Sequence, residues 1–189
     1  CFFMIQVVRI IFKQQEIKLI VTEAKKKGQK VVITQGSFDL VHIGHARYCE
    51  KAKSFGDLLI VGVDSDEKVR ARKGKNRPIV PQDERMEMLT HLRSVDYVVL
   101  KELGDPKFSL IKAVKPDVLV ATKGTYDTAT IRYLETICGK IVVLEPMATT
   151  STTGKIRLMQ MKTANSIKDK MTSKLIATIE DVLAEFKDD

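Results

Sequence analysis

Residues 30–45 read KVVITQGSFDLVHIGH, an apolar run followed by a glycine-containing turn and two histidines. The run from Lys30 to Thr34 is short, nearly continuous and rich in β-branched residues, which is typical of a strand buried on both faces. A helix is predicted to follow over Ile43–Ser54. This order of strand, turn and helix favours a parallel sheet with its crossover helices packed against it.

The same alternation continues outward in both directions. Apolar runs predict strands at 30–34, 57–63, 96–100, 117–121 and 140–144, and helical patterns predict helices at 14–27, 43–54, 83–92, 108–114 and 128–138. We therefore predict an α/β fold, a Rossmann-like doubly wound parallel sheet of about five strands with helices on both faces. Ligands of such sheets bind outside the carboxyl ends of the strands, so the residues that follow each strand should meet in one place.

The two ends of the chain lie outside this alternation. Residues 1–12 are apolar but contain Gln6 and Arg9. They are too few to span a bilayer, and they lack the basic start and cleavage site of a signal peptide. We expect a buried strand or helix, or an interface segment. From about Ala164 to Phe186, apolar residues recur every three or four positions, which predicts an amphipathic C-terminal helix.

The composition is that of a soluble globular protein with a basic excess. The chain has 189 residues, of which 44% are hydrophobic and 30% charged, and its formal net charge is +8. Such a charge favours anionic partners: nucleic acid, a membrane surface or a phosphorylated metabolite. The three cysteines, Cys1, Cys49 and Cys138, form no CxxC pair, so neither a zinc ribbon nor a disulfide framework is supported. We expect a reducing cytoplasm.

The residues after the first strand suit a phosphate. His42 and His45 are three positions apart at the start of a predicted helix, so both imidazoles can point the same way. A helix N-terminus attracts anions, and Gly44 leaves room where a side chain would meet a polyphosphate. The alternative is a pair of surface or capping histidines. A metal site would need further ligands, which the sequence does not place nearby.

Two other segments are candidates for binding anions. Arg70–Arg77 (RARKGKNR) is expected to form a polar loop, a mobile lid or clamp, unless it is only a solvated charge run. Ser151, Thr152 and Thr153 open another predicted helix, where hydroxyl and N–H groups can form a second anion site or simply cap the helix.

GSFDLVHIGH (36–45) resembles the signature of the cytidylyltransferase-like nucleotidyltransferases. The resemblance continues through residues 52–89 and RSVDYVV (93–99) to TSTTGKI (150–156), and covers about 28–156. Within that superfamily the chain looks closest to the domain that makes ADP-heptose from heptose 1-phosphate. The resemblance implies that an acceptor phosphate attacks the α-phosphorus of a nucleoside triphosphate and that pyrophosphate leaves.

The resemblance also implies roles for individual residues. The catalytic residues would be His42, His45 and Lys73. The nucleotide-binding residues would be Gly36, Ser37, Phe38, Gly44, Gly124, Ser151, Thr152 and Thr153. The acceptor-binding residues would be Asp39 and Arg77, although Asp39 could instead bind a metal or only stabilise the turn. Arg85 and Arg93 match family positions but could serve as intramolecular ion pairs. Mg²⁺ is expected because triphosphate charge usually travels with it. No dense carboxylate cluster marks a metal site built by the protein.

Departures from the family pattern leave the substrates open. The heptose group usually has Lys-Gly-Gly-Asp-Tyr after its fourth strand, whereas this chain has TKGTY at Thr122–Tyr126. It also has Gln35 and Ser37 where that group more often has Asn and Cys. A CTP-dependent enzyme acting on glycerol 3-phosphate or a phospho-alcohol is the alternative, and a non-catalytic nucleic-acid-binding relative is a third reading. HIGH at 42–45 and KMTSK at 170–174 also match motifs of class I aminoacyl-tRNA synthetases, but the second lies on the amphipathic tail.

We therefore expect a nucleotidyltransferase domain over residues 1–162, with 1–28 appended, and a C-terminal helix over 163–189 for packing or dimerisation. The expected partners are ATP or CTP, with ATP favoured, and a phosphorylated small acceptor, a sugar phosphate such as heptose 1-phosphate. We expect a homodimer in the cytoplasm, with no membrane span and no nucleic-acid partner.

Overall fold

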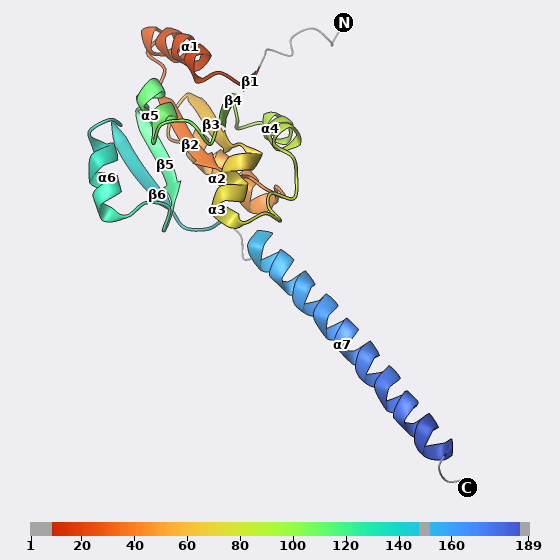
Figure 1. Ribbon diagram of the computed structural model, residues 1–189. Coiled ribbons are helices and arrows are strands. Elements are labelled where there is room, and N and C mark those ends of the chain that lie inside the picture. The colour runs from red at the N-terminus through yellow and green to blue at the C-terminus, as the bar shows by residue number, and fades with distance from the viewer. Residues whose placement is uncertain (1–8, 148–151, 186–189) are drawn as a thin grey trace, which may run out of the picture. The chain divides into compact units, whose positions relative to one another are not determined.

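A computed structural model describes residues 9–147 and 152–185 (Figure 1). The first unit, 1–149, is built on one six-stranded sheet in which every neighbouring pair is parallel. The strand order is β1-β4-β3-β2-β5-β6. The strands are β1 (Ile10–Ile11), β2 (Val31–Gly36), β3 (Leu58–Asp64), β4 (Tyr97–Lys101), β5 (Val118–Thr122) and β6 (Lys140–Leu144). The predicted α/β fold with a parallel sheet is confirmed.

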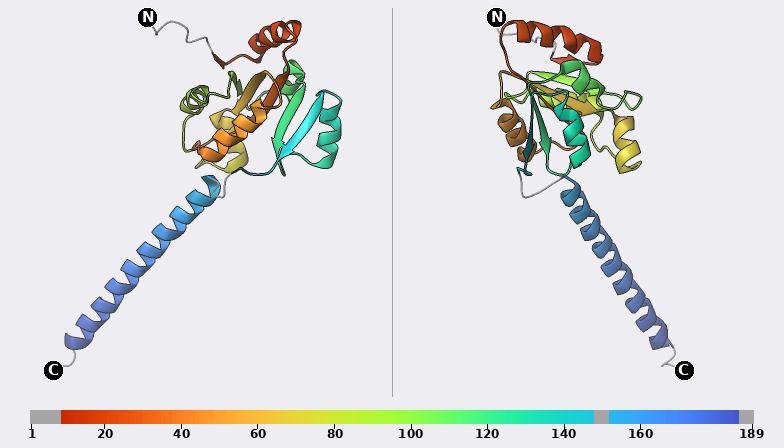
Figure 2. Two further views of the ribbon diagram at one scale, coloured as in Figure 1. Left: turned by 180° about the vertical axis from the view of Figure 1, so that it is seen from behind. Right: turned by 90° about the vertical axis from the view of Figure 1, so that its left-hand side faces the viewer.

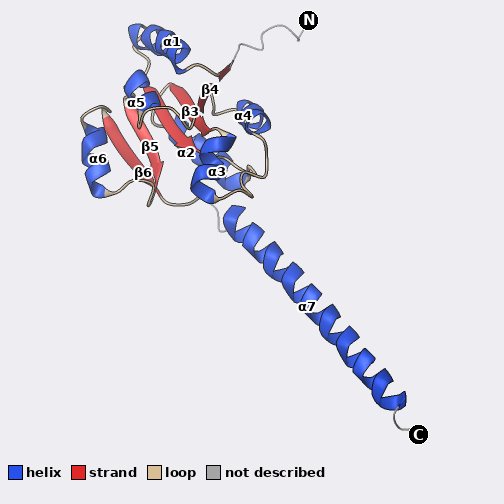
Figure 3. Cartoon of the chain, viewed as in Figure 1, coloured by secondary structure: helices blue, strands red, loops and turns tan. Residues whose placement is uncertain are grey.

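Helices cover both faces of this sheet (Figures 2 and 3). Helices α1 (Gln14–Lys26), α5 (Ser109–Val114) and α6 (Thr128–Glu135) pack their apolar sides into one core. Helices α2 (Ile43–Lys53) and α4 (Gln82–Thr90) pack into the core on the other face. The strands read as continuous apolar runs because their alternate side chains enter these two cores.

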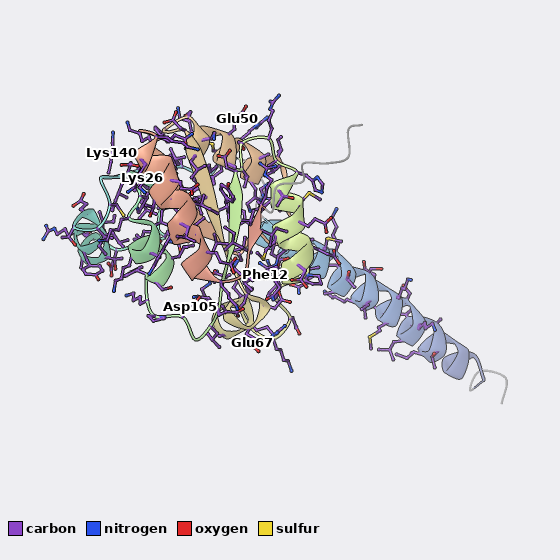
Figure 4. All side chains as sticks on the ribbon, turned by 90° about the horizontal axis from the view of Figure 1, so that it is seen from above. Phe12, Lys26, Glu50, Glu67, Asp105 and Lys140 are labelled. Atoms are coloured by element: carbon purple, nitrogen blue, oxygen red, sulfur yellow. The ribbon has the colours of Figure 1, made fainter. Side chains whose placement is uncertain are left out.

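The carboxyl ends of the strands lie at one edge of the body. Figure 4 shows Phe12, Glu67 and Asp105, which follow β1, β3 and β4, at one edge, and Lys26 and Lys140, which precede or begin strands, at the opposite edge. Segments that follow different strands are therefore neighbours in space, which is the condition for a shared binding site.

The sheet has six strands, whereas about five were predicted. The strand that was one alternative for residues 1–12 is confirmed at β1, where Ile10 and Ile11 pair with Val98 and Val99. The neighbouring Arg9 belongs to this arrangement, since its guanidinium donates to the carbonyls of Thr90 at 2.7 Å and Asp96 at 3.2 Å.

The prediction of a loop over Arg70–Arg77 is wrong in its first half. Helix α3 spans Asp66–Lys73, and only 74–77 lie outside it. Ser65 begins the helix by accepting a hydrogen bond from the Lys68 N–H at 3.3 Å, and Asp66 and Glu67 occupy the first turn, where negative charge is favoured. Gly74, with φ of 94°, ends it.

The second unit, 150–189, contains helix α7 (Thr152–Glu185). It is one continuous helix, so the helix predicted to open at Ser151 and the amphipathic segment from about Ala164 are parts of one element. Its described side chains are exposed, and they include the large apolar residues Met159, Met161, Ile167, Met171, Leu175, Ile176 and Ile179. In residues 9–147 and 152–185, no helix has both the length and the apolarity needed to cross a membrane.

Candidate active site

The two histidines lie together at the start of α2 and bond to its backbone. His42 is the N-cap, and its Nδ1 accepts a hydrogen bond from the Gly44 N–H at 3.0 Å. The His45 Nδ1 accepts from the His42 N–H at 3.2 Å. The ring centroids are 4.2 Å apart. The capping role that we considered as an alternative is therefore real, and it orients both rings.

These hydrogen bonds also fix where each imidazole carries its proton. An Nδ1 atom that accepts a hydrogen bond has no proton, so the neutral ring carries its proton on Nε2. Burial lowers the pKa of His45 from 6.5 to about 4, and His42 and Lys73 add to this effect. His45 is thus a neutral Nε2–H donor near pH 7, which is suited to a phosphate oxygen.

The turn between β2 and α2 has an unusual backbone. Phe38 and Leu40 have positive φ values of 47° and 52°. Phe38 is buried, and its ring lies with its centroid 5.6 Å from that of His45. A Cβ on Gly36 would lie 3.2 Å from the Phe38 ring, so glycine allows the turn to close. The turn therefore positions the ring that supports His45.

Lys73 reaches this turn from the end of α3. Its Nζ donates to the Ser37 Oγ at 2.8 Å. Partial burial lowers the pKa of Lys73, and the nearby Arg72 and Arg77 lower it further, against the opposing effect of Asp39 and Asp64. The three residues predicted to be catalytic, His42, His45 and Lys73, thus lie around one turn.

Asp39 and Arg77 contact each other. The Arg77 Nε donates to the Asp39 Oδ2 at 2.7 Å, and the Asp39 carboxylate also accepts from the N–H groups of Ile79 and Val80 at 3.0–3.1 Å. Burial alone would raise the pKa of Asp39, but these backbone N–H groups and Arg77 outweigh it and hold the pKa below its usual value. This arrangement favours the interpretation that Asp39 stabilises the turn, by anchoring residues 77–80 to it.

Arg85, on α4, connects the segments around the site. Its guanidinium donates to the carbonyls of Ser37, Asp64 at 2.9 Å and Val80 at 2.9 Å, and to the Asp66 Oδ1 at 2.7 Å. It is only 1% exposed. The ion-pair role considered for Arg85 is confirmed, whereas Arg93 is exposed.

Sequence reasoning missed two polar groups at the strand ends. On β2, the Thr34 hydroxyl lies 2.7 Å from the hydroxyl of Tyr48, which donates to the Val120 carbonyl at 3.1 Å. At the end of β3, Asp64 accepts from the Lys101 Nζ at 3.0 Å. In the sequence, Asp64 could have been found from its position directly after the strand predicted at 57–63.

The remaining predicted residues are not brought to this turn by the described contacts. Gly124 lies in a turn after β5, with φ of 82° and a hydrogen bond from the Thr125 N–H to the Thr122 carbonyl at 3.0 Å. Ser151 lies outside the described residues, and so do the side chains of Thr152 and Thr153, whose backbone begins α7. Their convergence with the histidines stays a prediction.

The described residues contain no group of three His, Cys, Asp or Glu side chains placed to hold a metal ion. The buried carboxylates next to the turn, Asp39 and Asp64, are each bonded to a basic side chain. This donor set does not resemble a magnesium site built by the protein, which would offer free oxygen ligands.

Known proteins and one family model resemble this chain. A family model described as "Cytidylyltransferase-like" matches residues 33–178. The bifunctional protein HldE of a Nitratiruptor species is 51% identical over 106 residues, which are 56% of this chain and 23% of that protein. HldE of Helicobacter pylori is 53% identical over 92 residues, 49% of this chain and 20% of that protein. The chain thus spans less than a quarter of these curated relatives.

Solved structures show the same fold. The lipopolysaccharide core biosynthesis protein from Thermoplasma volcanium matches with a TM-score of 0.56 and 31% identity, over 64% of this chain and 100% of that chain. Pantoate-beta-alanine ligase from Francisella tularensis matches with a TM-score of 0.54 over 77% of this chain and 69% of that chain. Its identity of 19% supports a shared fold alone.

Proposed function

The chain belongs to the cytidylyltransferase-like family, and on that basis we propose that it joins the nucleoside monophosphate of a nucleoside triphosphate to a phosphorylated small acceptor, releasing pyrophosphate. The observation that carries this proposal is the grouping of His42, His45 and Lys73 around the turn at the carboxyl end of β2. Two imidazole Nε2–H donors at a helix N-terminus, with one ammonium beside them, are suited to a polyphosphate.

ATP and a sugar phosphate are the proposed substrates. The residues after the first strand resemble heptose 1-phosphate adenylyltransferase domains, and the relatives at about 50% identity are HldE proteins. The solved structure at 31% identity is a lipopolysaccharide core biosynthesis protein, which is consistent with a sugar-phosphate acceptor.

The reaction requires positioning more than proton transfer. An oxygen of the acceptor phosphate forms a bond to the α-phosphorus, and the bond from that phosphorus to the bridging oxygen of pyrophosphate breaks. The acceptor phosphate is already ionised near neutral pH, so no general base is needed. The protein's contribution is to align the two phosphates and to stabilise the charge that accumulates on the transferring group.

The histidines are suited to this task because the backbone holds them in one tautomer. Each Nδ1 accepts from a backbone N–H, so each Nε2–H is available to a phosphate oxygen. In our proposal these groups hold the α- and β-phosphates, and the Lys73 ammonium neutralises the departing pyrophosphate or the acceptor. Ser151, Thr152 and Thr153 would complete the nucleotide site from the other side. Mg²⁺ would be carried by the triphosphate and lower its charge.

The test is pyrophosphate release from the purified protein with Mg²⁺, each of the four nucleoside triphosphates, and heptose 1-phosphate, glycerol 3-phosphate or phosphoethanolamine. We expect release with ATP and heptose 1-phosphate. Release only with CTP and a phospho-alcohol would replace ATP by CTP in the proposal. No release with any pair, together with salt-sensitive affinity for DNA or RNA, would contradict it in favour of a nucleic-acid-binding relative.

A His45→Ala variant tests the role of the imidazole. Its turnover should fall at least ~10²-fold, the cost of losing one transition-state donor. His91→Ala is the matched control, because His91 is exposed and lies at the end of α4. Near-normal turnover in His45→Ala would contradict the assigned role.

We also propose that the protein functions in a reducing compartment such as the cytoplasm, because the described cysteines, Cys49 and Cys138, are free and buried. Burial raises the pKa of the Cys49 thiol to about 12, which keeps it protonated and unreactive.

A further inference from the structure

A second polar cluster lies beside the candidate site, on the face of the sheet opposite α2. It consists of Gln35 on β2, Asp64 at the end of β3 and Lys101 at the end of β4, and we call it the strand-end cluster. In the register of the sheet, Gln35 pairs with Gly62 and Asp64 pairs with Lys101. Residues two apart on a strand share a face, so the three side chains lie on the same side.

The strand-end cluster is joined to the candidate site through α3. Arg72 donates to the Asp64 Oδ2 at 2.9 Å, and the next residue, Lys73, donates to the Ser37 Oγ at 2.8 Å. Arg85 donates to the carbonyls of both Ser37 and Asp64. The cluster and the phosphate-binding turn are therefore parts of one network.

Both carboxylate oxygens of Asp64 accept hydrogen bonds from basic side chains in this network. It is 2% exposed and forms ion pairs with Lys101 at 3.0 Å and Arg72 at 2.9 Å. Burial alone would raise its pKa, but these cations outweigh burial and hold the pKa below its usual value. The cluster therefore presents no carboxylate that could serve as a base or a metal ligand.

Gln35 is different, because its amide nitrogen has no partner among residues 9–147 and 152–185. The Nε2 is buried and makes no hydrogen bond within the described residues. A Cβ on Gly62 would lie 3.1 Å from the Gln35 Cγ and 2.9 Å from the Lys101 Cδ. The aliphatic parts of both side chains therefore pack against Gly62. A buried donor without a partner is costly and rare in native proteins. An amide nitrogen only donates, so the partner that satisfies it must be a hydrogen-bond acceptor, and the hydroxyl and ring oxygens of a sugar are such acceptors.

We propose that Gln35 determines acceptor specificity by donating a hydrogen bond to a neutral oxygen, a hydroxyl or ring oxygen, of the acceptor's sugar. This inference rests on the proposed nucleotidyl transfer. The cluster lies over β2, β3 and β4, on the side of α3 and Lys73, whereas the Thr122–Tyr126 turn follows β5 on the other side of β2. If the nucleotide occupies that turn, as the predicted role of Gly124 implies, the acceptor is the substrate nearest the amide.

Spacing supports this assignment. Lys73 bonds Ser37, which directly follows the end of β2 at Gly36, and Gln35 lies two residues earlier, a separation of about 7 Å for extended backbone. An acceptor whose phosphate contacts the Lys73 ammonium would extend its sugar ring over such a distance. The charged groups would then hold the phosphate, and the neutral amide would bind the neutral part of the molecule.

The test compares Gln35→Met and Gln35→Glu with a surface control, Gln29→Met. In the pyrophosphate assay, Gln35→Met should raise the KM for the acceptor ~3–10-fold, the loss of one neutral hydrogen bond, and leave the KM for ATP within about 2-fold. Gln35→Glu replaces the donor by an acceptor and should raise the acceptor KM further. Gln29 is exposed and lies before β2, so its variant should match the parent protein.

Deoxy analogues of the acceptor identify the contact. Removal of the recognised hydroxyl should weaken the parent protein but have little further effect in Gln35→Met, so the two losses should not add. Full additivity for every analogue, with the ring oxygen tested by a carbocyclic analogue, would overturn the proposal.

A structural role predicts the opposite result in the free protein. Because the Gln35 nitrogen has no partner to lose in the described part of the chain, Gln35→Met should leave the Tm unchanged or higher. A fall of more than about 3 °C would show that the amide is bonded in the free protein and would contradict the proposal. If the parent protein releases no pyrophosphate with any pair, the proposed function fails. If it does and the acceptor KM of Gln35→Met is unchanged, only this inference fails.

Discussion

Replacing Arg85 by methionine should destabilise the protein severely, because one buried guanidinium holds four acceptors. These are the carbonyls of Ser37, Asp64 and Val80, and the carboxylate of Asp66. Methionine keeps most of the volume of the side chain but donates nothing, so the buried carbonyls lose a hydrogen-bond donor that little water can replace, and the Asp66 carboxylate loses its ion pair.

The magnitude follows from burial. The Arg85 side chain is 0% exposed and that of Asp66 is 24% exposed, so the carboxylate regains some water while the carbonyls regain little. Each buried acceptor without a partner costs about 1–3 kcal/mol, and removing one member of a buried ion pair costs about 3–5 kcal/mol. We expect a loss of about 3–5 kcal/mol in the free energy of unfolding, since the surroundings relax in part.

Urea unfolding followed by circular dichroism measures this loss. Arg132→Met, an exposed position on α6, is the control and should change the free energy of unfolding by no more than about 0.5 kcal/mol. Arg85→Lys keeps the charge but not the planar fork, so it should fall between the two. A loss below about 1 kcal/mol in Arg85→Met would refute the view that this residue ties the site together.

Three further outcomes follow from described contacts. The pKa of His45 is about 4 in the folded protein and near 6.5 in the unfolded chain, so the unfolded chain binds more protons between these pH values. The free energy of unfolding should therefore fall as the pH falls from about 6.5 to about 4. His45→Gln should flatten this dependence, as measured by urea unfolding at several pH values. Gly62→Ala should lower both stability and turnover, because its Cβ would lie 2.8 Å from the Leu110 side chain and 2.9 Å from that of Lys101; a Tm equal to that of the parent protein would count against the tight packing. We propose that α7 mediates homodimerisation through its exposed apolar side chains, so Met171→Glu with Leu175→Glu should convert a dimer to a monomer in sedimentation equilibrium; an unchanged mass would rule this surface out.

The central strands were predictable because they are buried on both faces. β2, β3 and β5 contribute side chains to both cores, so their sequences are nearly uninterrupted apolar runs. β1 has two residues, too few for such a run to be distinguished from its surroundings. Helix α3 was not predicted because its sequence is mostly charged. Val69 is its one buried residue, so no apolar periodicity marks the helix, and its charged end resembles a polar loop.

In the candidate site, contacts between residues near in sequence were predictable, whereas contacts between distant residues were not. The histidines and the glycine turn are adjacent in sequence, so their proximity was predictable from the helical repeat. The contact between Lys73 and Ser37 links residues 36 positions apart, and the contact between Lys101 and Asp64 links residues 37 apart. The pairing of Asp64 with Lys101 depends on the register of two strands, which a single sequence does not reveal.

The proposed chemistry is tested most directly by the fate of the label in ATP. The protein is incubated with Mg²⁺, heptose 1-phosphate and ATP labelled with ³²P at the α- or the γ-phosphorus, and the products are separated by chromatography. Our account predicts that the α-label enters the nucleotide sugar and that the γ-label leaves in pyrophosphate. Transfer of the γ-label to the sugar, or release of the α-label as free AMP, would contradict it.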